Sequence, residues 1–469
     1  MKGVLAILKG RLVIVILSFL IVAMLPAAWF VSGNLNAKIR EQQTKAYQDE
    51  AAKIKRANRV TYTLPRISEA ESADALSLTR APNDRVTNWF KQQRAERERQ
   101  IGEITGRVIE FNRDSHERLI EAFPPAPDAD ARTVRRAPQE LARAITGDGR
   151  GYDRSAYEIL FEQMGAGKPP DREEVSQLIS EFEEREIDRL QNLAGESGQL
   201  SEDQENELAD SLVERRIGEY RRVAREISFY GSTAAVTGEQ QDSYGGSFRR
   251  SAPRSFDNLS YSEIPVVVPE ERPTLAQGYI WQWDYWVIED ILRAIARANT
   301  DAAGDPTPVE LSVVKRVESI RIEKFTIPDV ESEPADTMGF GGGGMMGSTS
   351  DDAAGPERVT ITGRKSGDGA YDLRRATVEV IVSPSRLIEF LDAIRATNLM
   401  TVTDLDLEEI DVWSDLAEGY FYGDDEYVMR ATIQIESVWL RDWTKEFMPG
   451  PVRKALGIAD EPVQMDDQG

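Results

Sequence analysis

The sequence predicts an α+β protein with a single N-terminal transmembrane helix, a long helical region and a C-terminal domain of two αββ halves. Residues 12–31 form an apolar run without a charge. Between residues 34 and 231, apolar residues recur at helical spacing. From residue 309 to residue 440, apolar and polar residues alternate as in half-buried strands, separated by one helical stretch.

The composition excludes several common kinds of site. The 469 residues include 81 acidic and 57 basic side chains, a formal net charge of −24, so we expect no nucleic-acid partner. There is no cysteine and one histidine, His116, which argues against disulfides, thiol nucleophiles, multi-histidine zinc sites and histidine-based triads. His116 is expected on a charged helix surface. We therefore predict no catalytic residue, cofactor or metal ligand.

The apolar run at 12–31 is long enough to cross a bilayer, because about 20 residues at ~1.5 Å per residue span roughly 30 Å. A cleaved signal peptide is the alternative, but its apolar region usually covers only ~7–15 residues, and no clear A-x-A site follows here. We expect an uncleaved anchor, a cytoplasmic stub over residues 1–11 and the rest of the chain outside the inner membrane. The residues expected at the membrane interfaces are Lys9, Arg11, Trp29 and Phe30.

The region after the anchor is predicted to be helical. We expect a polar neck over residues 32–66, a helical bundle or coiled coil over 67–231 and a Gly- and Ser-rich linker over 232–273. Four apolar residues follow each other at intervals of 3, 4 and 3, the spacing of a coiled-coil seam. This candidate helix-pairing seam consists of Ile101, Ile104, Val108 and Phe111.

Residues 274–448 are predicted to fold as helix, two strands, helix, two strands. Thr274 and Gln277 have the spacing of a capping box at the start of the first helix, and Ser383 is placed to cap the second. Each strand has one apolar and one polar face, so both helices should cover the same face of a four-stranded antiparallel sheet. The alternation slips near Thr403, which indicates a bulge. The expected strands cover 309–327, 372–382, 398–412 and 427–440.

Two segments of this half are expected to contribute little to the fold. Residues 331–356 form a glycine-rich insertion that we expect to be disordered, and residues 449–469 form a tail. The insertion matches GxGxxG literally, but no strand leads into it and no helix follows to receive a phosphate. A second Gly-Lys sequence, at 165–170, lacks the Ser or Thr of a P-loop.

The acidic run at residues 404–411 is the one sequence that could suggest carboxylate chemistry. The sixth position of a calcium loop would be glycine, and here it is Glu409. Alternation within a strand places Asp404, Asp406 and Glu408 on the solvated face. A carboxylate pair for glycoside hydrolysis stays open, because separation in space is not visible in a sequence.

The tryptophan-rich helix at 279–300 offers a candidate contact. At ~100° per residue, Trp281 and Trp283 fall on the apolar half, whereas Trp286 falls on the polar side with Tyr279 and Asp290. Exposed indoles are enriched at interfaces, so one hypothesis is a contact with a second subunit or sister protein there. The alternative is that this chain's own linker or helical half covers the indole. The candidate partner contacts are Trp286, Arg293 and Arg297.

Moving the last strand to the front of the αββαββ order gives βαββαβ, the ferredoxin-like arrangement. A cytoplasmic stub, one anchor, a helical neck and a permuted ferredoxin-like domain together resemble the PilO/GspM family of bacterial type IV pilus and type II secretion proteins. The resemblance covers residues 1–60 and 274–448 by architecture, and the helical region 67–255 departs from it, as an enlarged variant would. It implies a non-catalytic scaffold of the bacterial inner membrane, with its bulk in the periplasm, that forms a homodimer and pairs with a sister bitopic protein.

Two other classes of function stay open. One is an envelope sensor or ligand-binding module that signals through a partner, because the 11-residue stub cannot house an output domain. The other is an envelope hydrolase that uses Asp or Glu, which would require a cleft with a raised carboxyl pKa.

Overall fold

In the computed structural model, the chain divides into an N-terminal unit, Met1–Val108, and a C-terminal unit, Ile109–Gly469. The stub, the interface residues Lys9 and Arg11 and the glycine-rich insertion at 331–356 lie outside the described residues. The structure describes residues 12–67, 77–114, 116–125, 129–149, 151–194, 200–238, 260–325, 327, 361–364, 369–424 and 426–458.

The N-terminal unit is built on one long helix, α2 (Leu12–Ala57), which joins the expected anchor and the expected neck without a break despite Pro26. It contains the one helix of the described residues that is long and apolar enough to cross a membrane. Among the described residues, its large apolar side chains are exposed: Phe19 is 76% exposed and Trp29 is 82% exposed. A helix that is apolar all round needs a non-aqueous surrounding, as the sequence predicts.

A short hairpin, which the sequence analysis does not predict, follows α2. Strands β1 (Val60–Thr63) and β2 (Ser77–Arg80) pair antiparallel. The Tyr62 ring stacks on Phe90 of α3 (Asp84–Arg113) with centroids 5.0 Å apart. The hairpin thus ends the neck before the next helix begins.

The C-terminal unit contains a six-stranded sheet in the order β3-β4-β5-β6-β8-β7. Strands β5 to β8 pair antiparallel, as expected, and β6 and β8 are in register over their full lengths. Two short strands that the sequence analysis does not predict extend the sheet in parallel beyond β5. The strands are β3 (Ala166–Gly167), β4 (Phe229–Tyr230), β5 (Val314–Ile322), β6 (Tyr371–Val382), β7 (Met400–Glu409) and β8 (Met429–Leu440).

The alternation in the sequence explains the sheet. In β8, Ala431, Ile433 and Ile435 enter the core. The bulge expected near Thr403 is confirmed, because the β7–β8 register shifts between Val402 and Asp404. With the extra residue, Val402 before the slip and Leu405 after it both pack against the core, whereas Leu407 is 37% exposed.

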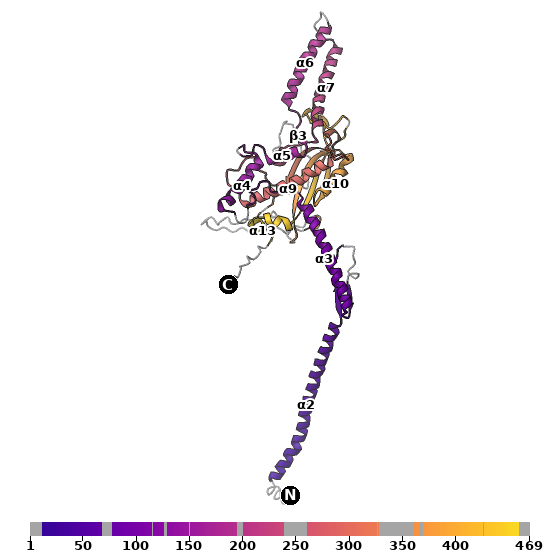
Figure 1. The fold of residues 1–469 in the computed structure, drawn as a ribbon, viewed down its shortest axis with the longest axis vertical. Coiled ribbons are helices and arrows are strands. Elements are labelled where there is room, and N and C mark those ends of the chain that lie inside the picture. Colours follow the sequence, from indigo (N-terminus) through magenta and orange to yellow (C-terminus); the bar gives the residue numbers. More distant parts are fainter. Residues whose placement is uncertain are drawn as a thin grey trace, which may run out of the picture. The chain divides into compact units, whose positions relative to one another are not determined.

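Two helices pack together across this sheet, α9 (Leu275–Ala298) and α10 (Leu387–Thr397) (Figure 1). The capping box at Thr274 and Gln277 is confirmed. At α10, the expectation was wrong in part: a 3-10 turn, η4 (Pro384–Arg386), precedes the helix, and Ser383 does not cap it. Leu387, Phe390 and Ile394 of α10 are buried, whereas Ile388 is 74% exposed.

From residue 109 on, the region expected as a helical bundle or coiled coil (67–231) belongs to the same unit as the sheet. Helices α4 (Ala131–Thr146) and α5 (Ala156–Gln163) pack on α9, and their apolar residues join the same core as the sheet. The approach of this layer is close at Gly278 of α9, where an added Cβ would stand 2.8 Å from the Phe123 ring. Because α4 and α5 cover α9 on the side away from the strands, α9 is buried on more than its apolar half.

Helices α6 (Arg172–Ala194) and α7 (Glu202–Glu226) lie side by side as a hairpin (Figure 1). Ser201 and Gln204 form a capping box at the start of α7. Val175, Tyr220 and Ala224 are buried in a second apolar cluster with Tyr422. The two amphipathic helices expected here are therefore present, with one end anchored in the C-terminal unit.

The expected linker and tail are partly folded. Helix α8 (Ala234–Thr237) lies in the expected linker, and Val452 of α13 (Gly450–Ala455), in the expected tail, is fully buried in the main core. These segments contain enough apolar residues to complete the core that α4 and α5 enter. The remaining short elements are η3 (Val309–Leu311), α11 (Val412–Ala417), α12 (Arg441–Thr444) and η5 (Lys445–Phe447).

Candidate functional site

The candidate contact residue Trp286 lies at the centre of an aromatic cluster. Its side chain is fully buried, and its Nε1 donates to the Glu117 carbonyl oxygen at 2.8 Å. The indole stacks on Trp439 of β8, with centroids 6.0 Å apart and planes 19° apart, and lies 5.3 Å from Trp443 of α12. The expectation that this side of the helix is exposed was therefore wrong.

The reason is the chain segment that crosses α9 on this side. Ile109 and Leu119 pack against the core, and the backbone at Glu117 accepts the indole hydrogen bond. Tyr279 and Asp290, expected on the polar side, are buried under the same layer, at 0% and 1% exposure. The alternative, that this chain's own helical half covers Trp286, describes the structure.

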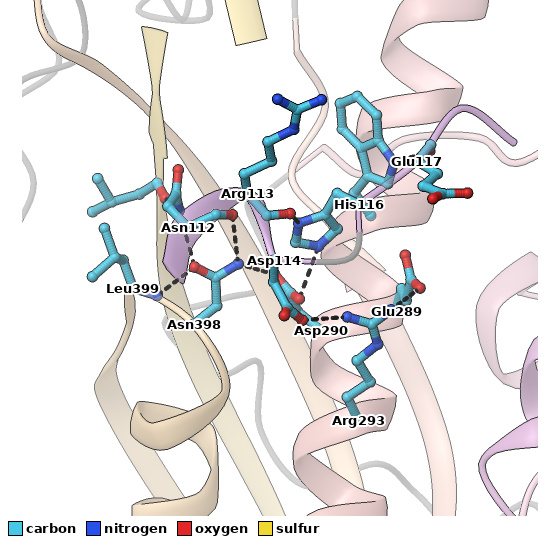
Figure 2. A network of polar contacts seen from close by, with 12 residues as sticks. Asn112, Arg113, Asp114, His116, Glu117, Glu289, Asp290, Arg293, Asn398 and Leu399 are labelled. Atoms are coloured by element: carbon cyan, nitrogen blue, oxygen red, sulfur yellow. Dashed lines mark hydrogen bonds and ion pairs between the residues drawn. The ribbon is translucent and has the colours of Figure 1, made fainter. Parts of the chain in front are cut away.

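The two arginines of the predicted contact also engage this chain. Arg293 pairs with Glu289 one turn earlier and with Asp114, 2.7 Å away (Figure 2). Arg297 is exposed and donates to the Ala396 carbonyl oxygen at 3.1 Å. Both arginines therefore bind groups of this chain, and Trp286 is buried by this chain.

His116 is the polar centre of the region and is buried, contrary to the surface position that we expected. Its side chain has no exposed area, and Nε2 lies 2.9 Å from Asp290 Oδ1 (Figure 2). Nδ1 lies 2.8 Å from the Arg113 carbonyl oxygen, which can only accept a hydrogen bond. Both ring nitrogens thus face acceptors, an arrangement that suits the doubly protonated imidazolium.

The surroundings of His116 favour its charged form. Burial acts to lower the pKa, but the Asp290 carboxylate, its hydrogen bond and the nearby Glu289 outweigh it, so the pKa of His116 is raised above its ordinary value. The imidazole also stacks on Trp443, with centroids 5.9 Å and planes 6° apart, a distance at which an aromatic face stabilises a cation. Burial likewise raises the pKa of the Glu289 carboxyl, against the opposing effect of Arg293.

Two asparagines extend the network from His116 to the sheet. Asn398 Nδ2 donates to the other oxygen of Asp290 at 2.7 Å, and Asn112 Nδ2 donates to Asn398 Oδ1 at 2.9 Å. The Asn112 side chain also donates to the Val438 carbonyl oxygen and accepts from Leu440 N and Trp443 Nε1. One connected network therefore joins Asn112 and His116 with α9, the α10–β7 turn and the β8–α12 corner. Figure 2 shows its part around His116, Asp290 and Asn398.

The residues around His116 connect several elements of the fold through hydrogen bonds. Because both His116 nitrogens face protein oxygens, the ring offers no free lone pair to a substrate in this arrangement. Among the described residues, no group of three or more His, Asp or Glu side chains is placed to hold a metal ion. The network instead fixes the end of α3 to the sheet and to α9 through buried hydrogen bonds.

Two further buried ion pairs hold the same layers together. Arg374 of β6 pairs with Asp284 of α9, and burial raises the pKa of the Asp284 carboxyl although Arg374 opposes the shift. Arg441 pairs with Asp372 and also donates to the Leu456 carbonyl oxygen at 2.9 Å. These carboxylates are neutralised by arginine within the core.

The residues of the acidic run at 404–411 are distributed rather than gathered. Asp404 is exposed and accepts from the neighbouring Leu405 N, Asp411 caps α11, and Glu408 lies 4.0 Å from Arg430.

The candidate helix-pairing seam is also open in the single chain. Ile104 is 49% exposed and Phe111 is 40% exposed, so the structure leaves this predicted pairing surface uncovered without testing it.

His116 and its partners carry little signal in the sequence. Asp290 lies 174 residues away and Asn398 lies 286 residues from Asn112, so neither spacing marks a motif. The one available hint is an aspartate on α9 among apolar neighbours, which a single histidine elsewhere could neutralise.

Comparison of the chain with protein-family models, curated proteins and solved structures gives no match.

Proposed function

We propose that the protein is a non-catalytic, single-pass scaffold of the bacterial inner membrane, in a type IV pilus or type II secretion-like assembly platform. It acts by forming a homodimer and by pairing with a sister bitopic protein. The observation that carries this proposal is the combination of one apolar N-terminal helix with the element order α9-β5-β6-α10-β7-β8.

The strand order supports the finer part of the proposal. The order β5-β6-β8-β7 across the sheet matches the order expected of a ferredoxin-like sheet whose first strand has been moved to the end of the chain. The helices α4 and α5, the α6–α7 hairpin and the strands β3 and β4 are additions to that plan in an enlarged member. On this reading, the PilO/GspM resemblance rests on architecture alone.

The polar core favours a scaffold over a hydrolase. Asp284, Asp290 and Asp372 are at most 1% exposed, and each is bound by an arginine or histidine of the same chain. Such pairs stabilise a fixed arrangement but do not present a carboxyl group to a substrate. The open apolar seam at Ile104, Val108 and Phe111 gives a dimer a place to form.

Two measurements test the proposal. Reporter fusions after residue 469 should be active outside the cytoplasm, and activity in the cytoplasm alone would contradict the orientation. Sedimentation of the detergent-solubilised full chain should give a dimer that Ile104→Lys with Val108→Lys dissociates. A strict monomer at tens of micromolar would remove homodimerisation from the proposal.

A further inference from the structure

Strand β7 is an open edge of the six-stranded sheet. Among the described residues, it pairs with β8 on one side and with no strand on the other. It is ten residues long, whereas the opposite edge, β3, has two. A long open edge offers a row of backbone donors and acceptors to an additional strand, and proteins usually shorten or cover such edges.

An exposed aromatic group stands where β7 ends. Trp413 of α11 is 79% exposed and stands four residues after the end of β7, and Leu407 within the strand is 37% exposed. Glu409 pairs with Met429, so Tyr427, which is 60% exposed, precedes the strand that pairs with this end of β7. Two exposed aromatic side chains are therefore close in sequence to the end of the open strand.

The position of Trp413 is fixed by buried contacts beneath it. Asp411 accepts from the backbone N–H groups of Trp413 and Ser414 and so caps α11. Asp415, on the same short helix, pairs with Arg316 at 3.2 Å and accepts from the Tyr422 hydroxyl at 2.7 Å. A large ring on a fixed support loses little conformational freedom on binding, which favours a role in recognition.

The charge of the surface determines what it accepts. Strand β7 contains four acidic side chains and no Lys or Arg. Beyond the strand, Asp415, Asp424 and Glu426 pair with Arg316, Arg221 and Lys315. A second copy that paired β7 with β7 would place Asp404 and Glu409, both exposed, against equivalent carboxylates, and like charges across strands are destabilising. A basic strand would instead place Lys or Arg side chains opposite these carboxylates, where the charges attract. The same cations could also contact the face of the Trp413 ring.

We propose that the β7 edge, with Trp413 and Tyr427 at its end, is the docking surface for an extended, basic segment of a partner protein, which adds to the sheet as a seventh strand. Backbone hydrogen bonds to β7 supply affinity, and the acidic side chains and the indole select the partner. The inference rests on the proposed scaffold function in that it names the chemistry of a partner.

The test is a titration of the detergent-solubilised full chain into fluorescein-labelled peptides, followed by fluorescence anisotropy. The peptides alternate Lys with Val or, as the control, Glu with Val, over the length of β7. The Lys-Val peptide should bind saturably and lose affinity as salt rises. Trp413→Ala should weaken it by about tenfold or more, as loss of an interface anchor does. Trp89→Ala, which removes an exposed tryptophan of the N-terminal unit, should leave the affinity unchanged.

A charge-reversed chain with Asp404→Lys and Glu409→Lys should instead prefer the Glu-Val peptide. Equal binding of both peptides, no binding, or an unchanged affinity after Trp413→Ala would overturn the proposal. A homodimer that Trp413→Ala dissociates would assign the edge to a second copy and overturn it as well. If the Trp413→Ala variant co-purifies with the same platform proteins as the unaltered protein, the β7 edge is not the docking surface. That result would not contradict the proposed scaffold function.

Discussion

His116 Nε2 and Asp290 Oδ1 lie 2.9 Å apart in the core, although 174 residues separate them in the sequence. This contact joins the end of α3 to the central helix α9, and Asn398 binds the second oxygen of the same carboxylate. The chain's single histidine is thus placed where it holds three elements together.

The first prediction concerns pH. Because the folded-state pKa of His116 is raised, its stabilising contribution is fully present below the unfolded value of about 6.5 and is lost as the pH rises through the folded value. The difference in melting temperature between the unaltered protein and His116→Gln should therefore be larger at pH 6 than at pH 9. Melting of both proteins over this range measures it, and a difference that stays constant or grows with pH would contradict a charged His116.

The carboxylate side of the contact gives a second prediction. Asp290→Ala leaves His116 and the Asn398 amide without their acceptor in a dry environment, and breaking a buried pair in this way costs about 3–5 kcal/mol. Chemical unfolding of the full chain, followed by tryptophan fluorescence, measures the loss. Asp392→Ala, which removes an exposed ion-pair partner on α10, serves as the control and should change stability by less than about 1 kcal/mol.

Trp286 and Trp283 should be equally important for stability. Both are fully buried and both contact Trp439, so each replacement by alanine should cost about 3–5 kcal/mol. Trp413→Ala should be close to neutral, because that indole is 79% exposed. If the Trp286→Ala variant loses as little unfolding free energy as the Trp413→Ala variant, Trp286 is not buried as described.

Two glycines in helices should respond to alanine in opposite directions. At Gly278, the new Cβ would stand 2.8 Å from the Phe123 ring, so we expect a loss of about 1–3 kcal/mol from overpacking. At Gly218 of α7, nothing lies within 4 Å of the new Cβ, so the higher helix propensity of alanine should stabilise by about 0.5–1 kcal/mol. Melting temperatures that shift in the same direction for both variants would contradict the close approach at Gly278.

The local elements were predictable from the sequence because their signals are local. The alternation in β8, the bulge at Thr403 and the capping box at Thr274 each depend on residues a few positions apart. The long apolar helix near the N-terminus follows from an unbroken apolar run, which no distant residue alters. These features therefore appear in the structure at the expected residues.

The candidate site was not predictable because its signals are distant. The helical phase places Trp286 on the polar side of α9, but the segment near Glu117, Trp439 of β8 and Trp443 of α12 surround the indole there. Aromatic residues and paired polar residues on a buried face of a helix give the sequence pattern of a solvent-exposed face. Such a helix therefore looks amphipathic in the sequence although it is covered on both sides. Contacts such as His116 with Asp290 arise from the chain's path, which periodicity does not encode.

The scaffold function is tested most directly by purifying the full-length protein from its native membrane in mild detergent and identifying the accompanying proteins by mass spectrometry. A membrane preparation of a strain that lacks the protein, carried through the same steps, is the control. The proposed function predicts recovery of a second bitopic protein together with pilus or secretion-platform components. Recovery of the protein alone, as a monomer, would contradict it.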